Sequence, residues 1–246
     1  MIKNILIGIQ AYSGVLKLMY KLKLWKYFAV PILISFVTGL AIFTSAYVFS
    51  DYLGDYITSI LPGWNSYSWL KTTFKILTSF IILLLGLILF KHIVMAFSAP
   101  FMSPVSEKIE TYLVGEKISP RNTSFSEQLW RGIRINMRNL FMELLLTIPI
   151  LILSFIPVLG LVAPILLFLV QAYYAGFGNM DYTLERHFNY SESIKFVNNH
   201  RGLSIGIGIV FILFLFIPVV GVILVLPLSV TAASIKTVEV IQQKQN

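Results

Sequence analysis

The chain has 246 residues, of which 57% are hydrophobic and only 12% are charged, and its mean hydropathy is +0.81. A soluble domain has about 25% charged residues, so this composition indicates an integral membrane protein. The 19 lysines and arginines outnumber the 11 acidic residues, but they flank apolar segments as the positive-inside rule describes, and we therefore exclude nucleic acid as a partner. The absence of cysteine excludes disulfides and thiol chemistry.

Few side chains could carry catalysis or hold a metal. The sequence has three histidines and none of the common nucleophile, phosphate-binding or zinc motifs. A nucleophile–base pair or a cluster of metal ligands is hard to assemble from so few groups. We therefore expect no enzyme activity, no metal site and no cofactor.

The first 95 residues predict one surface helix and two transmembrane helices. Residues 1–23 carry apolar side chains at helical spacing, which is typical of a helix lying at the membrane surface. These side chains are Ile2, Ile5, Leu6 and Ile9. Residues 24–49 and 74–95 are each long enough to span a bilayer. His92 is interpreted as an interfacial residue, because its own span holds no acidic partner for a proton relay.

Residues 98–143 predict helices in the cytoplasm or at the membrane interface. A proline-rich stretch ends the second span, and Ser103 with Pro104 starts a helix that carries Glu107 and Glu110 and ends at Gly115.

Ser124 and Glu127 form a capping box that opens the next helix. One face of that helix is apolar and the opposite face is basic. The apolar residues are Phe125, Leu129, Ile133, Met137 and Leu140, and the basic ones are Arg131, Arg134 and Arg138. The basic face is interpreted either as an attachment to anionic lipid or as an electropositive entrance that attracts an anion.

Two apolar runs, 144–170 and 203–234, contain the same interruption. The first has Pro157 and Gly160 in its middle, and the second has Pro218 and Gly221. Each run exceeds the roughly 20 residues of one span and falls short of the roughly 40 of two. Each is therefore either a hairpin that enters and leaves on one side or a single Pro-kinked span. The legs of the first run, 13 and 10 residues, are too short to cross, which favours the hairpin.

The distribution of lysine and arginine predicts the orientation. The N-terminus, the 98–140 region and the C-terminal tail are expected in the cytoplasm, and the loop 51–75 outside. The polar connector 171–202 has balanced charge, so the positive-inside rule does not predict on which side of the membrane it lies.

The apolar runs contain few candidates for function. Glu143 lies at the start of the first run, where a charge is either functional or an interfacial residue balanced by the arginines. Beyond each Pro-x-x-Gly, a helix N-terminus near Leu161 or Val222 could receive an anion, or the sequence could simply make a tight turn.

The chain resembles the CysZ-type sulfate permeases of the etoposide-induced-protein superfamily. The residues that carry the resemblance are Ala99-Pro100-Phe101, Glu107, Glu110, the two Ile-Pro-x-x-Gly turns, Asp181-Tyr182 and the stretch from Phe188 to Gly202. The resemblance covers roughly Lys21 to Ile235, most of the chain.

The resemblance implies an all-α integral membrane protein of the inner (plasma) membrane. It implies two long transmembrane helices, two partly penetrating helical hairpins and a homo-oligomer in the lipid bilayer. Its implied function is movement of an inorganic anion such as sulfate toward the cytoplasm for cysteine synthesis. The alternative is a non-transporting scaffold or envelope protein of the same fold.

The anion-binding residues implied by the resemblance differ here. Where sulfate-binding members have Gly-x-Arg before the first long helix, this sequence has Lys23, Leu24 and Trp25, followed by Lys26. A lysine supplies charge without the bidentate fork of an arginine. The candidate anion-binding residues are Lys23, Trp25, Lys26, Arg131, Arg134 and Arg138. The candidates for gating or structure are Glu107, Glu110, Glu143, Pro157, Gly160, Pro218 and Gly221.

Overall fold

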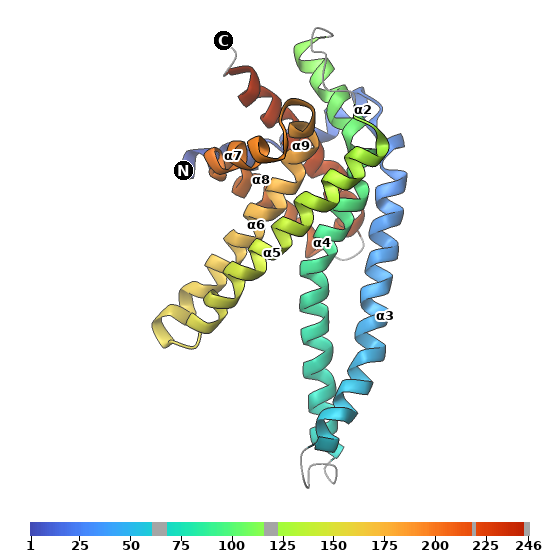
Figure 1. The fold of residues 1–246 in the computed structure, drawn as a ribbon, viewed down its shortest axis with the longest axis vertical. Helices are drawn as coiled ribbons and strands as arrows, with labels where there is room; N and C mark the ends of the chain where they lie inside the picture. Colours follow the sequence, from blue (N-terminus) through green and yellow to red (C-terminus); the bar gives the residue numbers. More distant parts are fainter. Residues whose placement is uncertain (61–67, 116–122, 218–219, 244–246) are drawn as a thin grey trace. The chain divides into compact units, whose positions relative to one another are not determined.

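A computed structural model describes residues 1–60, 68–115, 123–217 and 220–243 (Figure 1). This part of the chain is helical and contains no strand. The helices are α1 (Ile2–Gln10), α2 (Val15–Lys21), η1 (Leu24–Tyr27), α3 (Ala29–Ile60), α4 (Ser68–Val114), α5 (Phe125–Leu153), α6 (Pro157–His187), α7 (Tyr190–Asn199), α8 (Arg201–Leu215) and α9 (Val220–Gln243). The chain divides into two compact units, Ser35–Lys91 and the remainder.

Five of the described helices are long and apolar enough to cross a membrane: α3, α4, α5, α6 and α9. The shorter α7 and α8 are bent by 88° at His200 and pass the same test only as a pair. The prediction of an all-helical membrane protein is therefore confirmed. The helices extend well beyond the apolar segments 24–49 and 74–95, because hydropathy marks the part that lipid can contact and not the helix ends.

The unit Ser35–Lys91 contains most of α3 and the first half of α4, packed on each other. A Cβ on Gly86 would lie 2.3 Å from the Ile42 side chain, so the two helices approach closely there. Near the opposite end, Lys71 pairs with Asp55 and Lys75 with Asp51. These exposed pairs account for the balanced charge of this segment.

The predicted helix break at residues 98–104 is wrong, because α4 continues through Pro100 and Pro104. Pro100 lacks the N–H that would bond the carbonyl of Ala96, and α5 packs against this place. A Cβ on Gly132 would lie 2.9 Å from that carbonyl oxygen. The sequence predicts a helix end here because the proline leaves a backbone carbonyl without its helical donor, and in the structure α5 packs over that carbonyl. The predicted end at Gly115 is confirmed by its φ of +86°.

The first Pro-x-x-Gly interruption is a reversal of the chain between α5 and α6 (Figure 1). Pro157 is the first residue of α6, where its missing N–H costs nothing. Gly160 is helical, and positive φ among the described glycines is confined to Gly14 and Gly115. Gly160 is needed for space, since a Cβ there would lie 2.5 Å from the carbonyl oxygen of Ser154.

The second interruption has the same local geometry where it is described. The N–H of Gly221 donates to the carbonyl of Ile217 at 3.0 Å, as that of Gly160 does to Ile156 at 2.7 Å. A Cβ on Gly221 would meet the carbonyl oxygen of Phe214 at 1.8 Å. Pro218 lies outside the described residues.

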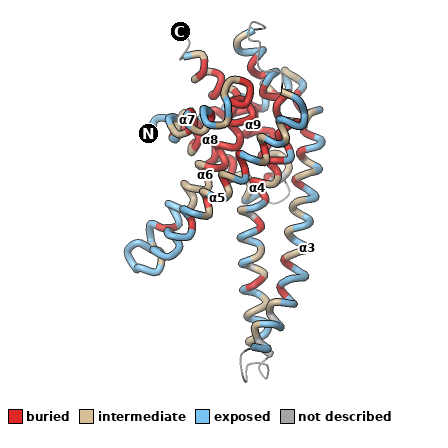
Figure 2. Tube along the Cα trace, in the orientation of Figure 1, coloured by how far each residue is buried: buried red, intermediate tan, exposed pale blue. Residues whose placement is uncertain are grey.

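The hairpin legs are longer than the sequence predicts. α5 has 29 residues and α6 has 31, and at 1.5 Å per residue both are about 45 Å long. The apolar run supplies only the part of each leg near the reversal, residues 144–153 of α5 and 157–170 of α6, and this end of the pair is exposed in Figure 2. The argument from short legs is therefore wrong, because the polar segments on either side continue the same helices.

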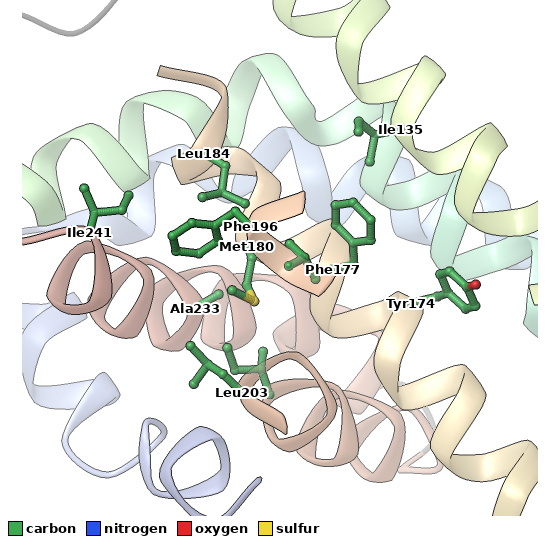
Figure 3. Close-up of a cluster of buried hydrophobic side chains, with 11 residues drawn as sticks. Ile135, Tyr174, Phe177, Met180, Leu184, Phe196, Leu203, Ala233 and Ile241 are labelled. Carbon is green, nitrogen blue, oxygen red and sulfur yellow. The ribbon is translucent and has the colours of Figure 1, made fainter. Parts of the chain in front are cut away.

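The predicted polar connector 171–202 is the centre of the core. Residues 174–186 are buried, and α6, α7, α8 and α9 enclose a cluster of apolar side chains (Figure 3). Its largest members include Phe177, Met180 and Phe196. α6 and α8 approach so closely that a Cβ on Gly208 would lie 1.7 Å from the carbonyl oxygen of Ala172. Small residues permit this approach, as in many membrane helix pairs.

The N-terminal segment is tied to this core. α1 packs along α8, and the Tyr12 hydroxyl donates to the carbonyl of Ile207 at 2.9 Å. Burial raises the pKa of Tyr12 well above its ordinary value. Ile2 and Leu6 remain exposed on the outer side of α1, which leaves the predicted membrane-surface placement open to test.

Candidate functional site

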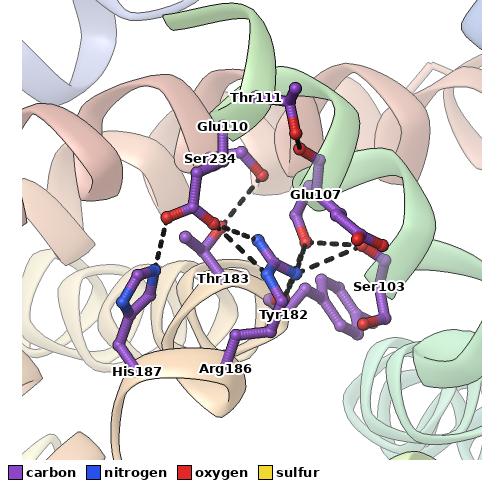
Figure 4. Close-up of polar contacts among 10 residues, drawn as sticks. Ser103, Glu107, Glu110, Thr111, Tyr182, Thr183, Arg186, His187 and Ser234 are labelled. Carbon is purple, nitrogen blue, oxygen red and sulfur yellow. Dashed lines mark hydrogen bonds and ion pairs between the residues drawn. The ribbon is translucent and has the colours of Figure 1, made fainter. Parts of the chain in front are cut away.

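Charged side chains lie buried where α4 meets α6 (Figure 4). Glu110 of α4 accepts two hydrogen bonds from Arg186 of α6, at 2.8 and 3.2 Å to one carboxylate oxygen. His187 contacts its other oxygen at 2.5 Å. The side chains of Glu110 and Arg186 are only 5% and 3% exposed, so this is an ion pair inside the protein.

The remaining donors of Arg186 are also satisfied. One terminal nitrogen donates to the carbonyls of Ser103 and Tyr182 and, at 2.6 Å, to the hydroxyl of Ser106. The carbonyl of Ser103 also accepts a hydrogen bond from the Ser106 hydroxyl at 2.9 Å, so Ser103, Ser106 and Arg186 form one connected network. A buried guanidinium needs this full set of acceptors to offset its desolvation.

A second ion pair joins α5 to α6. Arg131 donates to both carboxylate oxygens of Asp181, at 2.9 and 3.2 Å. It also donates to the carbonyl of Phe188 and the hydroxyl of Ser193. The predicted basic residue Arg131 is therefore held by protein groups that an incoming anion would have to displace.

Glu185 lies between the two ion pairs. Its side chain is buried and hydrogen-bonds Ser103, and it interacts electrostatically with both Arg131 and Arg186. Its Oε1 atom makes no hydrogen bond within the described part of the chain. Glu185 thus connects the Glu110–Arg186 pair to the pocket that opens beside Arg131.

That pocket, which we call the arginine pocket, has a volume of about 260 Å³. It lies between the start of α5, the end of α6 and the start of α7. Its charged lining consists of two arginines and two glutamates, Arg131, Arg134, Glu127 and Glu185, and its polar lining includes Gln128 and Asn189. A drug-sized ligand needs about 300–1,000 Å³, so the arginine pocket suits a small polar species.

Arg134 is the accessible cation of the arginine pocket. It is exposed, and its guanidinium lies 4.0 Å from the centre of the Tyr190 ring. Two capping boxes hold the surrounding backbone: Ser124 with Glu127 starts α5, as predicted, and Asn189 with Glu192 starts α7. A stacked guanidinium keeps its in-plane donors available to an oxyanion.

Arg138 is directed elsewhere. Its guanidinium lies 5.5 Å from the Phe177 ring centre and donates to Asn139 at 3.0 Å. The three arginines thus face α6 and α7, whereas Trp130, Met137 and Phe141 of α5 are exposed. The basic face is an internal contact surface for much of its length, because its charges have partners on the neighbouring helices.

A third buried pair contradicts the interpretation of His92. Its Nε2 atom lies 3.0 Å from the carboxylate of Glu143, and the two side chains are 3% and 0% exposed. The acidic partner absent from its own helix is supplied by α5. Glu143, which the sequence predicts as either an interfacial or a functional charge, is fully buried in this pair.

The predicted residues near the first span form a separate basic surface. Lys26 of η1 and Lys108 of α4 each lie 5.2 Å from the centre of the Tyr27 ring. Lys23 is exposed with a positive φ of 51°, and Trp25 is 42% exposed against Phe28. Lys26 and Lys108 thus contact the ring of Tyr27 in η1, whereas the arginines contact residues of α5, α6 and α7.

The remaining candidates have simpler positions. Glu107 is exposed on α4, and it is Glu110, one turn later, that makes the buried ion pair with Arg186. Within the described residues no group of three or more histidine or acidic side chains could hold a metal ion. Sequence reasoning missed Asp181, Glu185 and Arg186 as internal residues, although the four-residue spacing of Asp181 and Glu185 places those two on one side of a helix.

The long apolar helices and the charges buried between them define a polytopic helical membrane protein. Residues 11–226 match the family described as sulfate transporter CysZ/etoposide-induced protein 2.4. The match covers most of the chain, and the protein belongs to this family. No curated protein matches the chain.

Proposed function

We propose that this protein moves an inorganic oxyanion such as sulfate across the inner (plasma) membrane, with the arginine pocket as a place where the anion binds. The observation that carries the proposal is a pocket lined by two guanidiniums and by Glu185, a carboxylate that interacts electrostatically with Arg186 of the ion pair buried between long apolar helices. Charges inside a membrane protein are costly and mark ion pathways.

Arg134 makes the first contact in this proposal. It is exposed, stacked on Tyr190, and presents a planar set of donors that matches two oxygens of a tetrahedral anion. Arg131 is reached next, and there the anion competes with Asp181 for the same bidentate geometry. Because the anion must displace the Asp181 carboxylate from Arg131, part of its binding energy is lost there, which permits binding without permanent capture.

The basic surface near the first span attracts the anion toward the protein in this proposal. Lys23, Lys26 and Lys108 are exposed cations next to Tyr27, and they raise the local concentration of anions through long-range electrostatics. Trp25, at the position of an arginine in sulfate-binding relatives, cannot bind the anion through charge. The arginine pocket replaces that position in the proposal.

The proposal includes partly penetrating hairpins and cytoplasmic termini. Two observations support this. One pocket is lined both by His200, just before α8, and by Lys236 and Gln243 near the end of α9. Asn4 of the N-terminal helix α1 lines the same pocket. Both ends of the α8–α9 pair and the N-terminal helix are thus at one end of the unit, as a re-entrant hairpin requires. A homo-oligomer would shield the backbone of the exposed tips near Phe155 on one side and leave the other side in contact with lipid.

Cysteine accessibility tests the topology without background, because the sequence has no cysteine. Lys3→Cys, Lys195→Cys and Phe155→Cys each introduce one thiol. We expect an impermeant maleimide to label the first two from the same side of the membrane and not to label the third. Labelling of Lys195→Cys from the opposite side would refute the hairpin arrangement.

Uptake of labelled sulfate into proteoliposomes tests the function. We expect flux with the unaltered protein, and an apparent affinity about ten- to a hundredfold weaker in Arg134→Gln, since hydrogen bonds to charged groups contribute about 1.5–3 kcal/mol. Arg134→Lys should recover charge but little of the affinity.

Lys195→Gln is the matched control, because it removes one exposed cation of α7 that does not line the arginine pocket. Equal flux in Arg134→Gln and Lys195→Gln would refute the role of the pocket. An absence of sulfate flux with the unaltered protein would refute the permease and favour a non-transporting scaffold of the same fold.

A further inference from the structure

A second groove lies on the other side of the α5–α6 pair, facing α8. Its volume is about 410 Å³, and most of its lining is aliphatic. The aliphatic residues are Leu146, Ile150, Leu166, Leu169, Val170 and Ile205. They come from the portions of α5 and α6 nearer the exposed tip and from the start of α8. We call this the aliphatic groove.

One end of the aliphatic groove is polar and positively charged. The Tyr173 hydroxyl donates to the side-chain oxygen of Asn198 at 2.8 Å, and both residues line the groove beside Arg201. Arg201 is exposed, and no acidic residue in the described part of the chain forms an ion pair with it. It is also the first residue of α8, where the positive end of the helix dipole lies.

A second cation lies near the same end. Arg138 and Arg201 both act electrostatically on the Tyr173 hydroxyl, which places two guanidiniums around it. Glu143 acts on the neighbouring Tyr174, and its carboxylate is already paired with His92. The polar end of the aliphatic groove therefore favours a negatively charged group.

The surroundings provide access from lipid. Phe155, Val158 and Leu161 at the tip of the α5–α6 pair are 88%, 75% and 81% exposed, as expected of side chains in contact with acyl chains. A molecule that enters the aliphatic groove from this direction meets hydrocarbon side chains first and Arg201 last.

We propose that the aliphatic groove binds one anionic phospholipid. An acyl chain lies along Leu166, Leu169 and Ile150, and the phosphate contacts Arg201 with Asn198 beside it. The argument rests on charge complementarity together with an aliphatic lining, a combination that neither a free anion nor a neutral lipid satisfies. The site is separate from the arginine pocket, so it goes beyond anion transport and does not depend on it.

Native mass spectrometry of the intact purified protein tests the site. The protein is mixed with dioleoylphosphatidylglycerol or with dioleoylphosphatidylcholine, and the retained lipids are counted. We expect tighter retention of phosphatidylglycerol, and about fivefold weaker retention in Arg201→Gln, the change expected from one basic residue near an anionic headgroup. Leu169→Trp, which fills the aliphatic part, should lower retention of the same lipid.

Three comparisons can overturn the proposal. Lys195→Gln removes an exposed cation of α7 that does not line the groove, and this variant should retain phosphatidylglycerol as the unaltered protein does. An equal loss of retention in Lys195→Gln and Arg201→Gln would refute a specific site. Ile205→Trp repeats the groove-filling test on α8, and unchanged retention in both tryptophan variants would refute the aliphatic groove as the location. Displacement of the lipid by millimolar glycerol phosphate would show that the occupant is a free phosphate compound.

Discussion

Glu110→Ala should be among the most destabilising single substitutions in this protein. The substitution removes both charge-assisted hydrogen bonds from Glu110 to Arg186 and the contact with His187. Arg186 then keeps its acceptors from Ser103, Ser106 and Tyr182 but has lost the carboxylate hydrogen-bonded to it at 3% exposure, and only the electrostatic interaction with Glu185 remains.

The magnitude follows from burial. Removing one partner of a buried ion pair costs about 3–5 kcal/mol, because the other charge stays desolvated and uncompensated. Two hydrogen bonds to a charged group at about 1.5–3 kcal/mol each give a similar sum. The matched control is Glu239→Ala, whose pair with Lys236 is 43% and 25% exposed and contributes less than about 1 kcal/mol.

Equilibrium unfolding of the purified protein in mixed micelles, followed by circular dichroism, measures both free energies of unfolding. Glu110→Leu combined with Arg186→Met should recover most of the loss, since an apolar pair of similar volume removes both desolvation penalties. A loss for Glu110→Ala no larger than for Glu239→Ala would refute the buried pair. A double variant less stable than Glu110→Ala would refute the explanation by an uncompensated charge.

Two further predictions concern helix contacts. Gly208→Ala should prevent stable folding or lower the free energy of unfolding by more than about 3 kcal/mol, because its Cβ would lie 1.7 Å from a backbone oxygen of α6. Gly39→Ala is the control: its Cβ would have its nearest neighbour at 3.9 Å, so this variant should be neutral or stabilising by up to about 1 kcal/mol. Thermal unfolding of both variants compares them, and equal midpoints would contradict the close packing of α6 and α8. Glu143→Leu should lower the free energy of unfolding by about 1–3 kcal/mol, because it removes the carboxylate that contacts His92. Adding His92→Leu to the same protein should restore part of that free energy. If the losses of the two single variants simply add in the double variant, the contact between His92 and Glu143 is contradicted.

Several parts of the fold follow from short-range chemistry. The capping box at Ser124, the end of α4 at Gly115 and the reversal before Pro157 depend on residues close in sequence, and each is present in the structure. Composition alone indicates a membrane protein, since apolar length and charge depletion are properties of the chain and not of its packing.

The local pattern misleads where a distant segment changes its environment. Pro100 and Pro104 predict a break, yet α5 packs over the site and α4 continues. The charged residues of 171–202 predict a polar connector, yet Glu110, Arg131 and Ser103 supply partners that allow the segment to be buried. A sequence shows the charge of a residue but does not show the charge opposite it.

The candidate site was predicted only in part. Arg131, Arg134 and Arg138 are correctly placed on one face of a helix by their spacing, but that face has different partners at each arginine: an aspartate, a tyrosine ring and a phenylalanine ring. Burial of a charge depends on partners that the fold brings from other helices, and this is why the pair of His92 and Glu143, separated by 51 residues, could not be inferred from either helix alone.

The sequence by itself determined the membrane class, the family resemblance, the start of α5 and the reversal before α6, because these depend on hydropathy, capping and proline chemistry within a few residues. The tertiary structure decided which charges are buried, how long the helices are and where pockets open. It did so because an ion pair inside a helical membrane protein is stable only when the packing of separate helices brings both charges and all their hydrogen-bond partners together.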